Sequence, residues 1–406
     1  MNNIHNILIV GGGPAGTFAA LAAKQQKPAA SVTLLSEEHC EPYEKPPLSK
    51  AVLLGKISPN DSLIAGPKGV AGSGVILEAQ ARCTAIDRSS HSVLLQGGRR
   101  LRYDMLVLAT GAIAREIPQL PVDMPGVHYL RTEAHARVLK SELKANRKLL
   151  VIGGGLIGLE VAASAAELGL QTTVLEVAPR ILMRVCDEET SAVVHAAHQQ
   201  RGVDIRVNTA LSSISRLADG RIKVGLVNGT FVTADLVVVG VGSVPNDSVA
   251  ATAGLQVNDG IIIDEYCRTS DPAIFAAGDA VRFPGPKGLI RLENWRHAQD
   301  QGVVAGSNAA GADIPYVTVP SFWSEQYDLY IQGIGWSANG STRIRRVLGG
   351  DGSLSFHVRD NRLVFVMGIN AQRDIAIARR LIERSVPVEL TALSDPSQPL
   401  SKMVLG

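Results

Sequence analysis

The sequence predicts an α/β protein with two Rossmann-like dinucleotide-binding domains and a C-terminal α+β domain. Three observations support this prediction. A strand, a glycine turn, a helix, a second strand and an acidic residue follow one another at 7–37 and again at 149–176. A β-hairpin pattern follows each copy, so the two parts form an internal duplication. Beyond Pro315, short strands precede one helix, and this last part has no glycine fingerprint of its own.

The first copy begins with an apolar run at 7–10 and continues, after its glycine turn, into a helix of small residues. The turn contains the glycines Gly11, Gly13 and Gly16. In this pattern the first glycine makes a tight turn, the second lets the backbone approach a pyrophosphate, and the third lets helix and strand pack closely. The N–H groups at the helix start carry partial positive charge, which suits phosphate. A second strand at 32–35 leads to Glu37, at about the offset expected for an acid that binds ribose.

The stretch between the two fingerprints contains a proline motif, a loop and a hairpin. Pro46-Pro47 favours an extended entry and then the start of a helix, because proline is tolerated in a first helical turn. The segment 58–74 is rich in glycine, proline and serine, which predicts a surface loop. Apolar runs at 92–96 and 101–111 flank Gly97-Gly98 and predict the hairpin.

The second copy has the same parts as the first. An apolar run at 149–152 leads into the turn, and a second run at 172–175 ends on Glu176. The glycines of this turn are Gly153, Gly155 and Gly158. Glu176 would accept hydrogen bonds from the adenine ribose hydroxyls and would repel a 2′-phosphate. The sequence therefore predicts NADH as the coenzyme of this unit and not NADPH.

The second hairpin repeats the plan of the first. Its strands, at 222–227 and 231–242, flank Asn228-Gly229, a pair that strongly favours a tight hairpin turn. Each hairpin has an aspartate before its last strand and a glycine at its end, namely Asp104 and Gly111 in the first and Asp235 and Gly242 in the second. The duplication therefore extends beyond the fingerprints.

The remaining chain predicts short strands and one further domain. A pair of strands is expected between 261 and 278. In the C-terminal domain, we expect strands at 331–335, 356–358 and 363–367 and a helix at 374–384.

Composition excludes several classes of protein. At 406 residues and 46% apolar content, the chain can form two or three domains with full cores. No apolar run approaches the ~18–20 residues that cross a bilayer, and the first strand starts too early for a signal or transit peptide, so we expect a cytoplasmic protein without a membrane partner. A net charge of +2 without a dense basic stretch argues against nucleic acid. Four scattered cysteines indicate neither a metal site nor a redox disulfide.

Six motifs together resemble a known family. They are Ala109-Thr110-Gly111, Gly278-Asp279, Pro46-Pro47-Leu48-Ser49-Lys50, Gly240-Val241-Gly242 with Pro245-Asn246, Glu293-Asn294-Trp295 and Phe322-Trp323-Ser324-Glu325-Gln326. With the two nucleotide units, they resemble the two-dinucleotide flavoprotein reductases of the glutathione reductase fold. More narrowly, the chain resembles the NADH-dependent ferredoxin reductases of bacterial oxygenase systems, the putidaredoxin reductase and biphenyl dioxygenase ferredoxin reductase group. Lys45 departs from the arginine often found in that group, but keeps the positive charge.

The resemblance implies an FAD-binding domain formed by 1–111 and 243–314, an NADH-binding domain at 112–242 and a C-terminal domain at 315–406. Asp279 would bond the ribityl chain of FAD, Cys83 would offer its backbone to the adenine, and Trp295 would line the isoalloxazine. The full set implied for FAD is Gly11, Gly13, Pro14, Ala15, Gly16, Glu37, Lys45, Lys50, Cys83, Ala109, Thr110, Gly111, Arg131, Asp279 and Trp295. The set implied for NADH is Gly153, Gly155, Leu156, Ile157, Gly158, Glu176, Arg184, Val241, Gly242 and Glu293.

The same resemblance implies a catalytic pair, Lys50 and Glu160. Held beside flavin N5, the Lys50 ammonium would stabilise the negative charge that the flavin gains with a hydride. Glu160 would limit the cost of burying that charge. Trp323 either packs in the interior or belongs to the surface that faces the electron acceptor.

The implied reaction passes a hydride from NADH to FAD and then single electrons to a [2Fe-2S] ferredoxin, which supplies an oxygenase. The cluster would belong to the partner, because this chain has no set of four spaced cysteines. The protein would be a monomer or a homodimer.

Two alternatives stay open at the level of sequence. One is an NADH oxidase or disulfide reductase that uses Cys40, although Glu38 and Glu41 would disfavour a thiolate there. The other is a redox-sensing interaction protein like apoptosis-inducing factor. That class usually needs a targeting leader and basic interaction segments, and the sequence shows neither.

Overall fold

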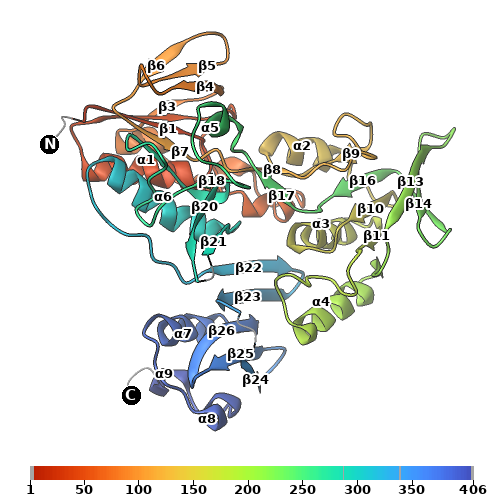
Figure 1. The fold of residues 1–406 in the computed structure, drawn as a ribbon. Coiled ribbons are helices and arrows are strands. Elements are labelled where there is room, and N and C mark those ends of the chain that lie inside the picture. The colour runs from red at the N-terminus through yellow and green to blue at the C-terminus, as the bar shows by residue number, and fades with distance from the viewer. Residues whose placement is uncertain (1–3, 287, 338–339, 404–406) are drawn as a thin grey trace. The chain divides into compact units, whose positions relative to one another are not determined.

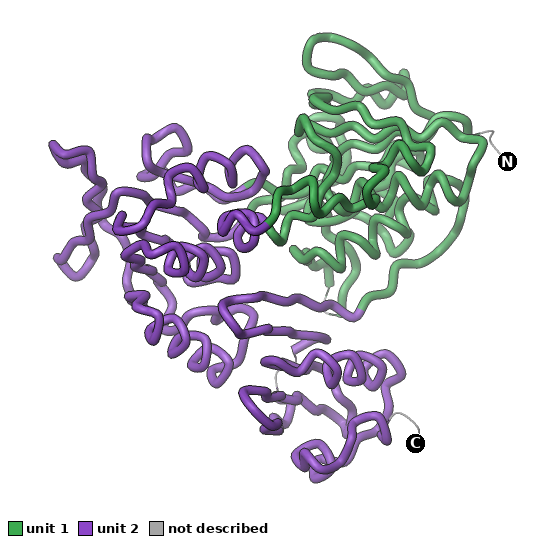
Figure 2. The backbone as a smooth tube through the Cα atoms, turned by 180° about the vertical axis from the view of Figure 1, so that it is seen from behind, with its two compact units in different colours: residues 1–47, 57–113, 243–318 green, residues 48–56, 114–242, 319–406 purple. Residues whose placement is uncertain are grey.

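The computed structural model describes residues 4–286, 288–337 and 340–403. Its residues divide into two compact units (Figure 2). Unit 1 comprises Met1–Pro47, Ile57–Ile113 and Ser243–Thr318, and unit 2 comprises Leu48–Lys56, Ala114–Gly242 and Val319–Gly406. Each unit contains a five-stranded parallel sheet, which confirms the α/β class predicted from the sequence (Figure 1).

The parallel sheet of unit 1 is built around the strand that precedes the first glycine turn. Its order is β19-β7-β1-β2-β3. The strands are β1 (Asn6–Val10), β2 (Ser31–Leu35), β3 (Ile76–Glu78), β7 (Met105–Leu108) and β19 (Ile274–Ala276). Side chains of β1 and β7 are buried almost throughout, as expected for a sheet that is covered on both faces.

Two helices of unit 1, α1 (Pro14–Gln26) and α6 (Trp295–Ala309), pack with their backbones almost in contact (Figure 1). A Cβ atom on Gly302 would lie 2.3 Å from the carbonyl oxygen of Ala15, and one on Gly306 would lie 2.0 Å from that of Ala19. Glycines one helical turn apart on α6 therefore fit against alanines on α1. This packing fixes the position of the helix that starts at the first glycine turn.

The parallel sheet of unit 2 repeats the plan, with the order β12-β11-β10-β16-β9. Its strands are β9 (Val127–His128), β10 (Lys148–Ile152), β11 (Gln171–Leu175), β12 (Asp204–Arg206) and β16 (Leu236–Val239). In both sheets the glycine-turn strand lies between the next strand of its fingerprint and the strand that ends the hairpin. Helix α3 (Leu156–Glu167) follows the turn as α1 does in unit 1. The structure thus confirms the internal duplication.

The second strand predicted for each hairpin, at 101–111 and at 231–242, is in fact two strands. The first of the two belongs to an antiparallel sheet and the second to the parallel sheet of the unit. The antiparallel parts are β4 (Cys83–Asp87), β5 (Ser92–Leu95) and β6 (Arg100–Arg102) in unit 1, and β13 (Leu211–Arg216), β14 (Ile222–Leu226) and β15 (Phe231–Ala234) in unit 2. The duplicated aspartates stand at these divisions. Asp104 accepts the N–H groups of His5 and Asn6 at 2.7 and 2.8 Å, and Asp235 accepts that of Lys148 at 2.7 Å. Each aspartate therefore holds the start of a glycine-turn strand.

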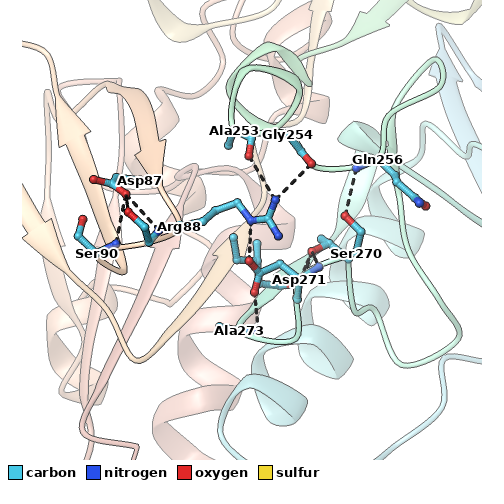
Figure 3. A network of polar contacts seen from close by, with 12 residues as sticks. Asp87, Arg88, Ser90, Ala253, Gly254, Gln256, Ser270, Asp271 and Ala273 are labelled. Carbon is cyan, nitrogen blue, oxygen red and sulfur yellow. Dashed lines mark hydrogen bonds and ion pairs between the residues drawn. The ribbon is translucent and has the colours of Figure 1, made fainter.

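A partly buried ion pair fastens the first hairpin to the rest of unit 1 (Figure 3). Arg88, at the end of β4, lies 2.6 Å from Asp271 and also donates to the carbonyl oxygens of Ala253 and Gly254. Ala253 and Gly254 follow helix α5 (Ser248–Thr252). The Arg88 guanidinium thus joins its own hairpin to segments more than 160 positions away in the sequence.

The C-terminal part of unit 2 is a five-stranded antiparallel sheet with its own core. Its order is β22 (Ser321–Gln326), β23 (Leu329–Gly335), β26 (Arg362–Ile369), β25 (Ser353–Arg359) and β24 (Thr342–Val347). The helices are α7 (Gln372–Glu383), α8 (Leu390–Ser394) and α9 (Leu400–Met403). The α+β class is confirmed, but the sequence-based prediction missed β22, β24 and the two short helices. Strand β24 was missed because its one buried residue, Arg346, is charged and resembles a surface residue in the sequence. The Arg346 guanidinium donates to the carbonyl oxygens of Ala392, Leu393 and Gln398.

The remaining elements complete the two units. The helix predicted after Pro46-Pro47 is a 3-10 helix, η1 (Pro46–Ser49). The segment 58–74 contains two more such helices, η2 (Pro59–Ser62) and η3 (Val70–Ser73), and Val70 is fully buried, so this segment is not simply a surface loop. The other elements are β8 (Ala112–Ala114), α2 (Glu133–Glu142), α4 (Glu188–Gln200), β17 (Ser243–Pro245), β18 (Ile261–Ile262), η4 (Gly278–Ala280), β20 (Val281–Gly285) and β21 (Gly288–Ile290).

In the part of the chain that the structure describes, no helix combines the length and the apolar character needed to cross a membrane. Over the same residues, histidine, cysteine, aspartate and glutamate form no group of three or more that could hold a metal ion.

Candidate functional site

The glycine turn of unit 1 brings three backbone segments together. Gly11 has a φ of +119°, and a Cβ atom there would lie 2.1 Å from the carbonyl oxygen of Ala109. A Cβ atom on Gly16 would lie 1.8 Å from the carbonyl oxygen of Gly11. Only glycine fits at these two positions, so the start of α1 and the Ala109-Thr110-Gly111 turn are held against the end of β1.

The middle glycine of the same turn has a different environment. Gly13 has an ordinary φ of −77°, and a Cβ atom there would have only Lys45 Cε, at 4.0 Å, as a neighbour within that distance among the described residues. Gly13 also begins α1, whose start receives no side-chain cap from the described part of the chain. Pro14 has no N–H, so the first-turn donors are those of Ala15 and Gly16. An open glycine beside uncapped N–H groups suits the pyrophosphate of a dinucleotide.

Other residues predicted for FAD lie close to this turn. Gly278, with a φ of +82°, approaches the helix start so closely that its Cβ would lie 2.7 Å from that of Ala15. Asp279 follows in η4. Thr110 donates from Oγ1 to the carbonyl oxygen of Asn246 at 2.6 Å, which holds the 109–111 turn in place. The structure therefore brings the two turns singled out in the sequence to the start of one helix.

A pocket of about 310 Å³ is lined in part by Cys83, the residue predicted to offer its backbone to the adenine. Its lining residues are Arg82, Cys83, Thr84, Gln96, Ser248 and Val249. Arg82 pairs with Glu37 at 3.5 Å, and the Glu37 side chain is 64% exposed, so its carboxylate is accessible for ribose hydroxyls. Burial raises the pKa of the Cys83 thiol to about 11, so this side chain lines the pocket as an unreactive thiol.

The aromatic and charged residues predicted near the flavin have partners in unit 1. The Trp295 ring meets Phe18 edge-on, with centroids 6.0 Å apart. Burial raises the pKa of Glu44, and a hydrogen bond with Trp295 partly offsets this rise. Lys45 forms an ion pair with Glu38 at 2.7 Å.

The glycine turn of unit 2 has the same geometry as that of unit 1. A Cβ atom on Gly153, where φ is +107°, would lie 2.4 Å from the carbonyl oxygen of Gly240, and one on Gly158 would lie 2.1 Å from that of Gly153. Around a Cβ atom on Gly155, the described residues leave 4 Å of open space. Gly155 begins α3, and no described side chain caps this helix. Leu156 and Ile157 form its first turn, where Ile157 is 48% exposed.

Glu176 is fixed by two backbone N–H groups of unit 2. Its Oε2 accepts from Gly154 at 2.7 Å and its Oε1 accepts from Ala178 at 2.8 Å. The guanidinium of Arg184 lies 3.8 Å from the position of a Cβ atom on Gly242. The carboxylate and the cation predicted to bind NADH thus lie at the loops that surround the glycine turn, next to Val241.

The predicted catalytic pair forms within unit 2. Lys50 Nζ lies 3.2 Å from Glu160 Oε2, and both side chains are largely buried. Glu160 lies on α3, and its carboxylate also accepts hydrogen bonds from the hydroxyls of Ser49 and, at 2.6 Å, of Ser324. Two residues 110 positions apart in the sequence are therefore in contact, and both carboxylate oxygens have partners.

The sequence did not predict the polar residues that are hydrogen-bonded, one to the next, to the Glu160 carboxylate of this pair. Ser324 and Gln326 alternate on β22, and Gln326 contacts His198 of α4. The spacing of Ser324 and Gln326 could have indicated that they act together, because residues two apart in a strand lie on the same face. Their partners could not be identified, since α4 and β22 are more than 120 positions apart in the sequence.

Two further residues predicted to bind a cofactor, Arg131 and Glu293, lie outside the two glycine turns. Arg131 directly precedes the N-cap residue Thr132 of α2 in unit 2. Glu293 lies in unit 1, where it forms an ion pair with Arg291 just before α6. Their assignments to FAD and NADH stay predictions.

None of the four cysteines, all of which the structure describes, takes part in a disulfide bond. Cys83, Cys186 and Cys267 are buried, and burial raises the pKa of each, to about 11 for Cys83 and about 12 for Cys186. These three are poor nucleophiles at neutral pH. Cys40 is partly exposed and is the one that a thiol mechanism would have to use.

Two buried histidines should make the fold less stable in mild acid. Burial lowers the pKa of His198 to about 4 and that of His297 to about 3. Between pH 6.5 and 4 the unfolded chain therefore binds more protons than the folded one, and the free energy of unfolding falls as the pH falls. The expected loss is on the order of 3 kcal/mol per histidine by pH 4.

Urea unfolding of the protein and of His198→Asn at pH 7.5 and 4.5 measures this loss of stability. The variant should lose less stability on acidification, and equal losses would contradict the prediction.

Comparisons with protein families cover both units. The family described as pyridine nucleotide-disulphide oxidoreductase matches residues 5–302, and the family described as reductase C-terminal matches residues 321–404.

Known proteins match over nearly the whole chain. The ferredoxin–NAD(+) reductase component of the p-cumate 2,3-dioxygenase system from Pseudomonas putida is 36% identical over 401 residues, with 98% of each chain covered. Rhodocoxin reductase from Rhodococcus erythropolis is 38% identical over 94% of this chain and 90% of its own length. A crystal structure of the covalent complex of putidaredoxin reductase with putidaredoxin matches with a TM-score of 0.93 and 34% identity, over 100% of this chain and 99% of that chain.

Proposed function

The chain belongs to the pyridine nucleotide-disulphide oxidoreductase family, and we propose that it transfers electrons from NADH, through FAD, to a [2Fe-2S] ferredoxin. The observation that carries this proposal is the pair of matching glycine turns, one in each unit. Each has an open middle glycine before a helix whose start no described side chain caps. Two such turns supply the two pyrophosphate sites that a flavoprotein reductase needs. Three relatives that match over almost their full length are reductases by name.

Each unit would bind one of the two dinucleotides. The turn at Gly13, with Glu37 and Asp279, would hold FAD on the domain 1–111 and 243–314. The turn at Gly155, with Glu176 and Arg184, would hold NADH on the domain 112–242. FAD accepts a hydride and releases single electrons, while the protein binds, orients and stabilises charge.

The acceptor would be a small ferredoxin that carries the iron–sulfur cluster. The four cysteines of this chain are scattered, and at least three of them are buried, so they do not form a cluster site of the usual kind. The ferredoxin would in turn supply an oxygenase, either a Rieske dioxygenase or a cytochrome P450. We place the protein in the cytoplasm as a monomer or a homodimer, with Trp323 as a candidate for the ferredoxin-facing surface.

The flavin content of the purified protein tests the proposal first. The protein should show a flavin spectrum, release about one FAD per chain on denaturation and contain no stoichiometric iron. A preparation that refolds with FAD in excess and still binds none would contradict the proposal, as would iron bound at one atom or more per chain.

Coenzyme choice should depend on Glu176. Its carboxylate is held by the N–H groups of Gly154 and Ala178. If it binds the adenine ribose, it would repel a 2′-phosphate, so NADH should be preferred. Replacing Glu176 by Arg should narrow the ratio of kcat/KM for NADH over NADPH by about tenfold or more, which corresponds to ~1.4 kcal/mol. Glu167→Ala, a change at the exposed end of α3, is the control and should leave the ratio unchanged. An unmodified protein that uses both coenzymes equally would refute the role of Glu176.

A thiol mechanism should be unnecessary. Cys40→Ser should retain nearly all NADH-driven reduction of ferricyanide and of ferredoxin, because the proposed electron path passes from the flavin to the partner without a cysteine. The measurement is steady-state turnover of both acceptors, with FAD content determined in parallel. Loss of most turnover while FAD is still bound would favour the NADH oxidase or disulfide reductase alternative.

A further inference from the structure

A row of buried hydrogen bonds leads away from the Lys50–Glu160 pair into the C-terminal sheet and α4. Ser324 donates to Glu160 Oε1 at 2.6 Å, and Gln326 Nε2 donates to Ser324 Oγ at 3.0 Å. Gln326 Oε1 lies 2.8 Å from His198 Nε2, and His198 Nδ1 lies 3.2 Å from the hydroxyl of Tyr327. All of these residues belong to unit 2.

The chemistry of the groups sets the direction of every bond. An ionised carboxylate can only accept, so Ser324 must donate to Glu160 and accept from the amide of Gln326. The amide oxygen of Gln326 then accepts from His198, which places the ring proton on Nε2 and leaves Nδ1 to accept from Tyr327. Each donor therefore points toward Glu160, and bonds aligned in this way polarise one another.

The burial of this row is costly unless all its members are bonded. Ser324 and His198 are 0% exposed and Gln326 is 1% exposed. A buried polar group without a partner destabilises a protein by about 1–3 kcal/mol, so such a row is kept intact only when each bond is made. A neutral His198 is required, and burial lowers the pKa of His198 to about 4, which keeps the ring neutral at physiological pH.

The row completes the environment of the Glu160 carboxylate. Oε2 meets Lys50 and Ser49, which come from the proline motif, whereas Oε1 meets Ser324, which comes from the C-terminal sheet. Without the bond from Ser324, the carboxylate could rotate and share both oxygens with Lys50 and Ser49. The position of the Lys50 ammonium depends on that rotation, because Lys50 pairs with Oε2 at 3.2 Å.

We propose that Ser324, Gln326 and His198 are positioning residues that orient Glu160 and, through it, place the Lys50 charge for hydride transfer. With FAD bound, NADH would give up a hydride and leave as NAD⁺, and the Lys50 ammonium would stabilise the negative charge that the flavin gains. The C-terminal domain is then part of the redox machinery through strand β22 in addition to any role in docking the acceptor. This inference rests on the proposed function, in which Lys50 acts on the flavin.

The test compares Ser324→Ala and Gln326→Leu with Lys50→Met in FAD-loaded protein. Both network variants should lower the two-electron potential of the flavin in the same direction as Lys50→Met, by a smaller amount. They should slow flavin reduction by NADH about threefold to tenfold in stopped flow. In a Lys50→Met background, Ser324→Ala should have no further effect on the potential, because it acts through Lys50.

Ser191→Ala is the matched control. Ser191 is also a buried serine of unit 2, but its hydroxyl bonds the carbonyl oxygen of Ile181, outside the row. It should lose a similar amount of stability in urea without a change in flavin potential. A ¹⁵N NMR spectrum of His198 should show the Nε2–H tautomer, and Gln326→Leu should shift its resonances.

The outcomes distinguish the action of Lys50 on the flavin from the positioning role of Ser324, Gln326 and His198. An unchanged potential in Lys50→Met would overturn the proposed action of Lys50 on the flavin. A shift in Lys50→Met with no shift in Ser324→Ala or Gln326→Leu, or an Nδ1–H tautomer of His198, would overturn the positioning role alone. Equal shifts of the flavin potential in Ser191→Ala and Ser324→Ala would show that the shift reflects a general loss of stability. That result would also overturn the positioning role.

Discussion

Gly13→Val is expected to give a folded protein that does not retain FAD. The backbone of Gly13 has a φ of −77°, which any residue adopts, and its Cβ position is open toward Lys45. A valine therefore fits the fold, but its methyl groups would occupy the space through which, as we propose, the pyrophosphate would approach the N–H groups of Ala15 and Gly16. We expect FAD affinity to fall by about 100-fold or more, a loss of ~2.7 kcal/mol. Flavin released on denaturation and the free energy of unfolding without FAD are the two measurements.

The corresponding variant of the second turn is the matched control. Gly155→Val has the same open geometry, so it should retain FAD at the level of the unmodified protein and raise the KM for NADH by about tenfold or more. Gly16→Val should behave differently from both, because its Cβ would lie 1.8 Å from a backbone oxygen and the fold itself should fail. Full FAD content in Gly13→Val, or loss of FAD in Gly155→Val, would contradict the assignment of the two turns.

Lys50→Met is expected to slow hydride transfer and to lower the flavin potential, while FAD stays bound. The Lys50 ammonium is largely buried beside Glu160, where a charge acts more strongly than in water. Loss of that charge should lower the two-electron potential by ~30 mV or more, equivalent to ~1.4 kcal/mol. Flavin reduction should slow by about tenfold or more with little change in NADH affinity, because the cation acts on the charge of the product.

A double-mutant cycle and a surface control test this interpretation. Glu160→Gln should have a smaller effect than Lys50→Met, and the double variant should fall short of the sum of the two. Lys56→Met removes a cation from the exposed Lys56–Glu167 pair of the same unit and should leave the potential unchanged. Additive effects would show that Lys50 and Glu160 act independently, and an unshifted Lys50→Met potential would mean that Lys50 does not face the flavin.

The parts of the fold that local sequence encodes were predicted correctly. Each glycine turn needs residues whose identity is dictated by backbone contact, such as Gly11 against Ala109 and Gly153 against Gly240. A short local pattern therefore reveals the turn, the strand before it and the helix after it. The duplicated aspartates, Asp104 among them, could be noticed in the sequence, but their bonds to the strand starts are seen only in the structure.

What the sequence could not predict depends on distant partners. Arg346 resembles a surface residue of a loop, yet its guanidinium is buried because three carbonyl oxygens near α8 accept its hydrogen bonds. Ser324 and Gln326 resemble the polar face of an exposed strand, but they lie on a buried row that ends at Glu160. Hydrophobic periodicity cannot separate these cases from solvated side chains, since only the tertiary fold supplies the partner.

The most direct test of the proposed function is an anaerobic titration of the FAD-loaded protein with NADH in the presence of a [2Fe-2S] ferredoxin from an oxygenase system. The flavin should be bleached by NADH and should recover as the ferredoxin is reduced, with about two ferredoxin molecules reduced per NADH, because each cluster takes one electron. Cys40→Ser should give the same yield. Flavin that is bleached by NADH but passes no electrons to any such ferredoxin, while reducing oxygen or a disulfide instead, would contradict the proposed function.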